Sequence, residues 1–240
     1  MRLRVILPVL GDSLAGAVRA DVAHWTAPGT DVDIVTLARG TASIESEYDE
    51  ALAGPGILER VAEAVADGVD GVFVDCFGDP AVPAAREIAD FPVVGGFEPA
   101  MLTALSLGER VGIVTVLPHV VPMLRSLARR HGLESRLGGI GVVDVPVLGL
   151  DGEGEALVEL LTARAGEAVA RGEADVIVLG CTGMLGVADA VRERLAASGT
   201  PVPVVDPTGA AVTWLERAHR LGLHPSRTTY MTPPAKTRNT

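Results

Sequence analysis

Short runs of β-branched and other apolar residues alternate along the chain with longer segments in which apolar residues recur every three or four positions. The short runs are typical of buried strands and the longer segments of amphipathic helices, so their alternation indicates a parallel sheet with crossover helices. The pattern predicts strands at residues 2–9, 32–37, 71–76, 92–95, 110–116, 141–147, 175–180 and 202–205. It predicts helices at residues 15–26, 56–67, 80–89, 98–107, 120–131, 153–171, 185–197 and 208–221.

The predicted strands fall into two sets of four, and the third strand of each set ends alike. The first of these reads DGVFVDCFGDP at residues 70–80, and the second reads ADVIVLGCTGM at residues 174–184. Each has an acidic start, an apolar run, a cysteine and a Gly-containing turn into a helix. We therefore expect an α/β protein with two similar lobes, each a four-stranded parallel sheet flanked by helices, related by a pseudo-twofold axis. Lobe 1 is expected at residues 1–97 plus 206–240, and lobe 2 at residues 98–205.

Length and composition exclude several classes of protein. The 240 residues are 48% hydrophobic, carry a formal net charge of −11 and include two cysteines. A chain of this length buries enough surface to need no disulfide or metal for stability. The negative charge opposes binding to nucleic acid, and no apolar run approaches the roughly 20 residues that span a bilayer. We expect a small-molecule substrate, no nucleic-acid or membrane partner, and a homo-oligomer.

The first ten residues, MRLRVILPVL, have a basic start and a short apolar stretch, as a secretory signal does. The apolar stretch is only about six residues long and ends at Gly11-Asp12, so a buried first strand is the better interpretation. We expect a cytoplasmic protein, in which thiols stay reduced. The polar, Pro-containing residues 224–240 are expected to extend from the core.

Cys76 and Cys181 are the candidates for chemistry. Ligands of open parallel sheets bind outside the carboxyl ends of the strands, where both cysteines are expected, so two facing lobes would bring the thiols to one cleft. A single free cysteine is often only a small buried hydrophobic residue, but two at matched positions favour a function. A reducing compartment disfavours a disulfide. The absence of HExxH and CxxC spacings and the scatter of the five histidines argue against a metal site.

A thiolate on one face and a thiol on the other are what inversion of a carbon acid requires. A helix N-terminus is expected to lower the pKa of each thiol, and Gly78 and Gly183 let backbone N–H groups point into the cleft. One sulfur removes the proton, the carbanion flattens into an enolate held by the N–H groups, and the opposite sulfur returns a proton. This chemistry needs no cofactor.

Seven segments carry a family resemblance over nearly the whole chain, of which the Cys-Phe-Gly-Asp-Pro and Gly-Cys-x-Gly-Met blocks are the most specific. They are residues 43–59, 70–80, 92–101, 112–118, 143–148, 174–184 and 203–212. Through them the chain resembles the hydantoin racemase branch of the aspartate/glutamate/hydantoin racemase superfamily. The resemblance implies two α/β lobes around a cleft and cofactor-independent racemisation by a cysteine pair, which Cys76 and Cys181 match. The leading substrate is then a 5-substituted hydantoin.

Two departures from the family pattern fall where substrate is bound. The family usually carries Asn-Pro-Asn-Thr/Ser after the first strand, whereas residues 8–13 read PVLGDS, so only Ser13 carries over. The family also tends to have a Thr-Thr pair after the fifth strand, where this chain has Thr115-Val116. The chemistry is expected to be retained while the identity of the substrate changes.

Substrate binding is assigned to eight residues at the expected cleft, seven of them polar or small and one aromatic. They are Ser13, Ser43, Phe77, Gly78, Asp79, Thr115, Thr182 and Gly183.

Several of these residues and their neighbours also have a structural interpretation. Ser43, Glu45 and Ser46 either enter the cleft or cap a helix. Asp79 is expected to cap the helix that follows it, and Glu98 to lie at a helix start where it favours the dipole. Thr182 either donates to substrate or bonds to nearby backbone.

Three alternatives remain open. The first is an epimerase of another cyclic amide such as a diketopiperazine. The second is a maleate-isomerase-like or arylmalonate-decarboxylase-like reaction on the same scaffold. Retention of both cysteines counts against the single-thiol decarboxylase pattern. The third alternative is a non-catalytic two-lobed protein that binds a small ligand. The cleft motifs are nearly uncharged apart from Asp75 and Asp79, which favours a neutral cyclic amide.

Overall fold

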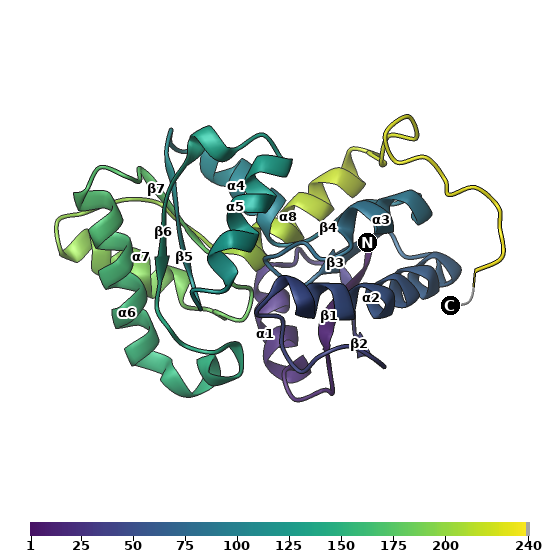
Figure 1. The fold of residues 1–240 in the computed structure, drawn as a ribbon, viewed down its shortest axis with the longest axis horizontal. Coiled ribbons are helices and arrows are strands. Elements are labelled where there is room, and N and C mark those ends of the chain that lie inside the picture. Colours follow the sequence, from purple (N-terminus) through teal and green to yellow (C-terminus); the bar gives the residue numbers. More distant parts are fainter. Residues whose placement is uncertain (239–240) are drawn as a thin grey trace.

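The computed structural model describes residues 1–238, apart from the side chains of residues 151–153. Strands and helices alternate along the described chain (Figure 1). The strands are β1 (Arg2–Leu10), β2 (Asp31–Leu37), β3 (Gly71–Val74), β4 (Val93–Val94), β5 (Val111–Thr115), β6 (Leu137–Val142), β7 (Val176–Leu179) and β8 (Val204–Val205). The α-helices are α1 (Ala15–Trp25), α2 (Glu47–Asp67), α3 (Val82–Ile88), α4 (Phe97–Leu105), α5 (Val120–Arg130), α6 (Leu150–Ala170), α7 (Ala188–Ala197) and α8 (Pro207–Arg220). Two short 3-10 helices are η1 (Glu134–Arg136) and η2 (Val147–Gly149).

The strands form two four-stranded sheets with the same internal order. The first sheet runs β2-β1-β3-β4 and the second runs β6-β5-β7-β8, with parallel pairing throughout. Every residue of β3 and β7 is buried, as expected for central strands covered on both faces. The predicted fold class is therefore confirmed, and the shared order is what an internal duplication produces.

Helices α4 and α8 each follow a strand of one sheet and pack on the other. Helix α4 follows β4 of the first sheet but contacts β5, β7 and β8, whereas α8 follows β8 of the second sheet but contacts α1 and β3. The two helices also contact each other, in the middle of the molecule (Figure 1). The lobe boundaries predicted at 97/98 and 205/206 remain a prediction that this packing supports. The last two residues of the predicted lobe 1, 239 and 240, lie outside the described residues.

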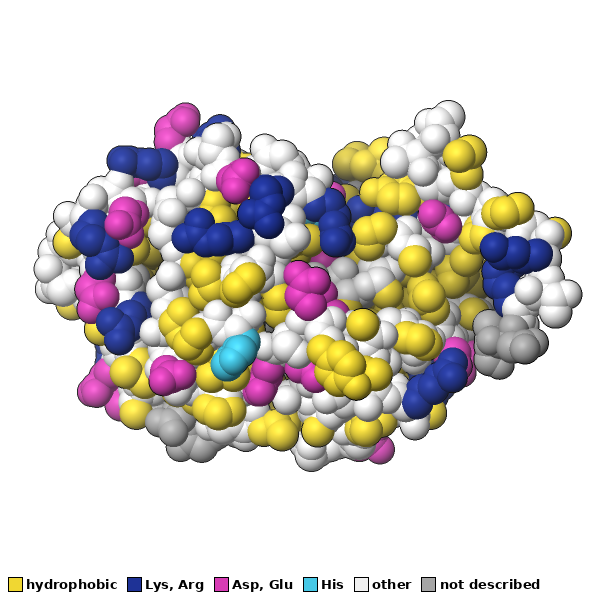
Figure 2. All heavy atoms as spheres, viewed as in Figure 1, with side chains coloured by type: hydrophobic (Ala, Val, Ile, Leu, Met, Phe, Trp, Pro, Cys, Tyr) yellow, Lys and Arg dark blue, Asp and Glu magenta, His cyan; other side chains and the backbone are white. Residues whose placement is uncertain are grey.

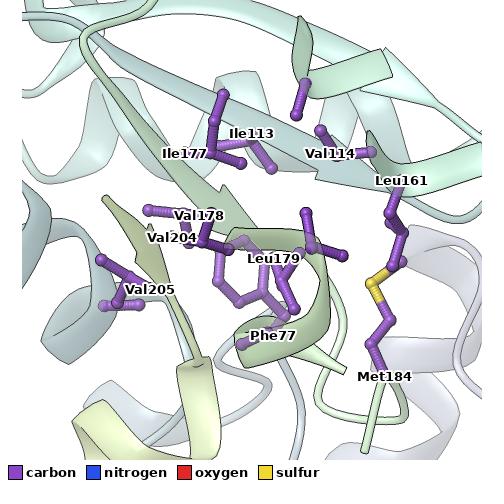
Figure 3. Packing of buried hydrophobic residues seen from close by; sticks show 14 of the residues in the cluster. Phe77, Ile113, Val114, Leu161, Ile177, Val178, Leu179, Met184, Val204 and Val205 are labelled. Carbon is purple, nitrogen blue, oxygen red and sulfur yellow. The ribbon is translucent and has the colours of Figure 1, made fainter. Parts of the chain in front are cut away.

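Phe77 ties the turn after β3 to the core of the second sheet. Its ring is only 3% exposed and packs among the side chains of β7 and β8 (Figure 3). It also meets the Phe97 ring edge-on, with centroids 5.5 Å apart. The turn that follows Cys76 is thus held against the half of the molecule that carries Cys181.

Two predicted elements are placed differently by the structure. Helix α2 begins at Glu47 rather than at residue 56, because Ser46 caps it: the Ser46 Oγ accepts a hydrogen bond of 3.2 Å from the Asp49 N–H. Strand β6 lies at Leu137–Val142 rather than at 141–147, because Asp144 adopts a φ of 60° that ends extended backbone there. The other elements agree with the prediction to within three residues at each end.

Candidate active site

A pocket of about 80 Å³ lies between the two sheets, beyond the carboxyl ends of β1, β3, β5 and β7. Both cysteines line it, together with the turns that follow them. The rest of the wall is mainly apolar and comes from both halves of the molecule: Val9, Leu14 and Ile44 on one side, Val116, Met123 and Val147 on the other. The topology therefore brings Cys76 and Cys181 to one pocket, where the sequence predicted a cleft.

The two sulfurs have matching backbone surroundings. Cys76 stands two residues after the end of β3, and Cys181 two residues after the end of β7. The Gly183 N–H donates to the Cys181 Sγ over 3.3 Å, and the Gly78 N–H donates to the Cys76 sulfur in the same way. A Cβ on Gly78 would lie 3.7 Å from its sulfur, and one on Gly183 would lie 3.4 Å away. Glycine at both positions keeps the space beside the sulfur open.

Burial controls the ionisation of both thiols. It raises the pKa of the Cys76 thiol well above its ordinary value and that of Cys181 to about 12, although the glycine N–H groups oppose the shift. The expectation that helix N-termini lower these pKa values is wrong, because α3 begins only at Val82 and α7 only at Ala188. Neither sulfur stands at a helix end. Both are thiols near neutral pH, so a neighbouring group has to accept a proton before either can act as a base.

The comparison with known proteins now decides the family. Residues 12–215 match the family described as Asp/Glu/hydantoin racemase. The chain belongs to this family. It is 36% identical over 239 residues to a hydantoin racemase of Pseudomonas sp. (strain NS671), covering 98% of this chain and 93% of that protein. The membership identifies the protein as an isomerase of the racemase type and confirms the resemblance seen in the sequence.

Two solved structures share the whole fold of this racemase. The allantoin racemase from Klebsiella pneumoniae has a TM-score of 0.92 and 34% identity, covering 100% of this chain and 96% of that chain. The allantoin racemase from Pseudomonas fluorescens has a TM-score of 0.93 and 32% identity, covering 100% of both chains.

Four of the eight predicted substrate-binding residues line the pocket of this racemase beside the cysteines. Phe77 and Gly78 follow Cys76, and Thr182 and Gly183 follow Cys181. Ser13 is exposed and Ser43 is partly buried, and neither belongs to the pocket wall. The structure thus gathers the residues of the two turns, while the loops after β1 and β2 contribute apolar side chains such as Leu14 and Ile44 instead.

Asp79 and Thr115 are buried and support the pocket from outside its wall. Asp79 accepts hydrogen bonds from the N–H groups of Phe97 (2.9 Å) and Glu98 (3.1 Å), so it caps α4. The prediction that it caps the helix following it, α3, is wrong, because a φ of 53° turns the side chain towards α4. The Thr115 Oγ1 donates to the Gly180 carbonyl over 3.0 Å and fixes the end of β7.

Other neighbours that the sequence singled out also form structural contacts. Glu98 lies in the first turn of α4, as expected, and also forms an ion pair with Arg86. The Glu45 Oε1 accepts a hydrogen bond of 2.8 Å from the Val147 N–H, across the pocket. Ser46 caps α2, as one of its two interpretations predicted.

Two buried carboxyl groups beside the sulfurs were not predicted as site residues. Glu50 lies in the first turn of α2, and Asp75 lines the pocket. Burial is the main cause that raises the pKa of each to about 7. The Ser46-x-x-Asp49 pattern was the available signal for Glu50, because it marks a helix start that places Glu50 one turn further on.

The described side chains provide no group of three or more His, Cys, Asp and Glu arranged to hold a metal ion. No helix within residues 1–238 is long and apolar enough to cross a membrane. On the face shown in Figure 2, acidic and basic side chains are interspersed rather than separated into patches of one sign.

Proposed function

We propose that the protein interconverts the two enantiomers of a 5-substituted hydantoin without a cofactor, with Cys76 and Cys181 as the acid/base pair. One observation carries the proposal: two sulfurs at equivalent positions of two facing sheets line a single pocket, each receiving an N–H from the glycine two residues on. The relatives, a hydantoin racemase and an allantoin racemase, support a substrate with this ring.

The reaction removes the proton from one face of the ring carbon and adds a proton to the opposite face. The hydrogen at C5 is acidic because the carbon adjoins a carbonyl group. The thiolate of one cysteine takes this proton, and the electron pair of the C–H bond moves onto the carbonyl oxygen to give a planar enolate. The turns after the sulfurs supply backbone N–H groups to the developing charge. The thiol of the other cysteine then gives its proton to the opposite face.

The pocket wall favours a small apolar substituent on the ring. Val9, Ile44, Val116 and Met123 offer no side-chain hydrogen-bond partner to a polar substituent. A polar group enclosed among such residues loses its hydrogen bonds to water without replacement. We therefore place 5-isopropylhydantoin ahead of allantoin, whose substituent is a ureido group.

The test follows one enantiomer of 5-isopropylhydantoin in D₂O. The protein should make the optical rotation decay while one solvent deuterium enters C5, faster than in the sample without protein. Cys76→Ser and Cys181→Ser should each abolish racemisation, and each should retain exchange of one enantiomer at most.

Three results would overturn this function. The first is the absence of exchange with hydantoins, which rejects the substrate; exchange confined to diketopiperazines would assign the protein to another cyclic amide. The second is turnover of maleate or an arylmalonate in place of exchange. The third is tight binding without turnover that both serine variants retain, which is the behaviour of a binding protein. The expected homo-oligomer and cytoplasmic location remain predictions.

A further inference from the structure

Glu50 faces the same small space as the sulfur of Cys76. A Cβ on Gly78 would overlap the Glu50 Oε1 and would lie 3.7 Å from the Cys76 Sγ, so carboxyl oxygen and sulfur adjoin one position. The Oε1 atom is buried, and no hydrogen-bond donor in the described part of the chain reaches it. A buried carboxyl oxygen without a donor is costly, which points to a use for it.

Asp75 lies beside the other sulfur, because it lines the same pocket as Cys181 and hydrogen-bonds to Thr182, the residue after Cys181. Asp75 directly precedes Cys76 in the chain, yet it lines the pocket. Its carboxylate raises the pKa of Cys181 more than any other charged group does. For Cys76, the charged group that raises the pKa most is Glu50. Asp75 is only 9% exposed, and its Oδ1 atom has no hydrogen-bond partner among residues 1–238. Each thiol therefore has one buried carboxyl group with an unpaired oxygen.

We propose that the two thiols exchange protons with separate carboxyl groups, Cys76 with Glu50 and Cys181 with Asp75, during the racemisation proposed above. Neither carboxyl group touches the reacting carbon, since each acts through its sulfur.

The reason lies in where the negative charge is held. No Lys, Arg or His is among the residues that line the pocket in the described chain. A thiol that lost its proton to water would therefore create a new charge in a buried apolar space. Transfer of that proton to an adjacent carboxylate only moves a charge that is already buried. The resting carboxylate thus supplies the charge that the thiolate needs.

The proton steps balance over one turnover. The S–H proton of Cys76 passes to the carboxylate of Glu50, and the resulting thiolate takes the proton from C5. Cys181 gives its S–H proton to the opposite face and becomes a thiolate, which then takes a proton from the carboxylic acid of Asp75. Glu50 releases its proton to solvent and Asp75 takes one up, which restores the starting state.

Other charged groups face each carboxyl group and set its pKa beside burial. Glu47 and Asp79 raise the pKa of Glu50, and Arg130 lowers it. A hydrogen bond with Thr182 lowers the pKa of Asp75. The carboxyl groups of Asp21 and Asp206 raise it. With both values at about 7, a protonated and an ionised carboxyl group coexist near neutral pH.

The experiment separates the two thiols and then removes each carboxyl group. In full-length Cys181→Ser only Cys76 can exchange the C5 proton, and in Cys76→Ser only Cys181 can. Deuterium exchange is measured in each background with the enantiomer that it accepts. Glu50→Gln should slow exchange at least tenfold through Cys76 and less than twofold through Cys181. Asp75→Asn should do the reverse. Equal slowing in both backgrounds, or slowing in neither, would overturn the proposal.

Glu47→Gln provides the matched control. Glu47 lies on the same helix as Glu50, also contributes negative charge near it, and is exposed. This variant should leave exchange in both backgrounds within twofold. If Glu47→Gln slows exchange as much as Glu50→Gln does, the effect belongs to overall charge and the assignment of Glu50 is wrong.

A second measurement covers the case in which the serine backgrounds do not exchange. Alkylation of Cys76 by iodoacetamide is followed by peptide mass spectrometry against pH, in the parent protein and in Glu50→Gln. The parent should show an inflection near pH 7, where Glu50 ionises, and the variant should lose it. Coincident profiles would reject the pairing. Failure of the parent protein to racemise any cyclic amide would instead reject the proposed function, whatever the alkylation profiles show.

Discussion

The Oε1 atom of Glu45 accepts a hydrogen bond of 2.8 Å from the backbone N–H of Val147 and thereby joins the loop after β2 to the start of η2. Val147 lines the pocket, and so does Ile44, the residue before Glu45. The bond thus links opposite walls of the pocket, and it holds them at the distance seen in this structure.

Glu45→Ala should loosen this closure and weaken substrate binding. A hydrogen bond to a charged group contributes about 1.5–3 kcal/mol, so KM should rise roughly tenfold or more while kcat changes less. Glu45→Gln keeps an acceptor oxygen, so its KM should lie between those of the parent protein and of Glu45→Ala. Steady-state kinetics with 5-isopropylhydantoin give both constants. A fall in kcat at constant KM in the alanine variant would show that the bond does not control closure.

Gly78→Ala should reduce activity strongly without unfolding the protein. The new methyl group would overlap the Glu50 carboxyl and press on the space beside Cys76, and a displacement of about 1 Å at a reacting group costs about 100-fold in rate. Gly54→Ala is the control on α2, where an added Cβ meets no atom within 4 Å. It should keep full activity, because the added methyl group reaches neither Glu50 nor Cys76. Equal activities of the two variants would contradict this account of Gly78.

Asp79 substitutions should separate the cap of α4 from backbone strain. Asp79→Ala loses two hydrogen bonds from α4 and places alanine at a φ of 53°, so the free energy of unfolding should fall by about 2–3 kcal/mol. Asp79→Asn keeps an acceptor and tolerates this backbone, so its loss should be about 1 kcal/mol. Urea unfolding of both variants measures the difference. If both variants lose the same free energy of unfolding, neither the backbone strain nor the cap of α4 accounts for the effect of the substitution.

The raised pKa of Asp75 makes stability depend on pH. Because burial raises its pKa from 3.8 in the unfolded chain to about 7, its contribution is fully present below about pH 4 and is lost as pH rises through 7. Asp75→Asn cannot ionise. It should match the parent protein near pH 4 and exceed its free energy of unfolding at pH 8 by on the order of 2–4 kcal/mol. Urea unfolding at both pH values tests this; a difference independent of pH would assign the effect to packing.

Val116→Thr should shift the preference towards allantoin. Val116 lines the pocket where the family tends to have a second threonine, and a hydroxyl there offers a hydrogen bond to a polar substituent. The kcat/KM ratio of allantoin to 5-isopropylhydantoin should rise about fivefold. Val114→Thr, on β5 just before Val116 but outside the pocket wall, should leave the ratio unchanged. A fall in both rates at constant ratio would show that Val116 does not select the substituent.

The fold could be predicted because its signal is local and repeated. The β-branched runs mark the strands, and the two matching strand ends at Cys76 and Cys181 reveal the duplication that places both thiols at one pocket. The sheet orders and the match to solved allantoin racemase structures confirm the fold class.

The chemistry around the thiols could not be predicted because it depends on distant parts of the chain. Burial of Cys76 and Cys181 comes from two sheets at once, so the pKa of each thiol rises where the local pattern indicated a fall. Glu50 was missed because the helix was expected to begin after it. The partner of Glu45 is a backbone N–H, and a backbone group leaves no mark in a sequence.

The packing of α4 and α8, each on the sheet that it does not follow, has a mechanical consequence. The backbone passes between the halves twice, next to Gly96 and next to Asp206, where α4 and α8 begin, and these two helices contact each other. A hinge with two neighbouring crossings can bend about one line but cannot swivel as a single tether can. Any opening of the two halves should therefore carry the sulfurs along one fixed arc and bring them back to the same spacing on closing.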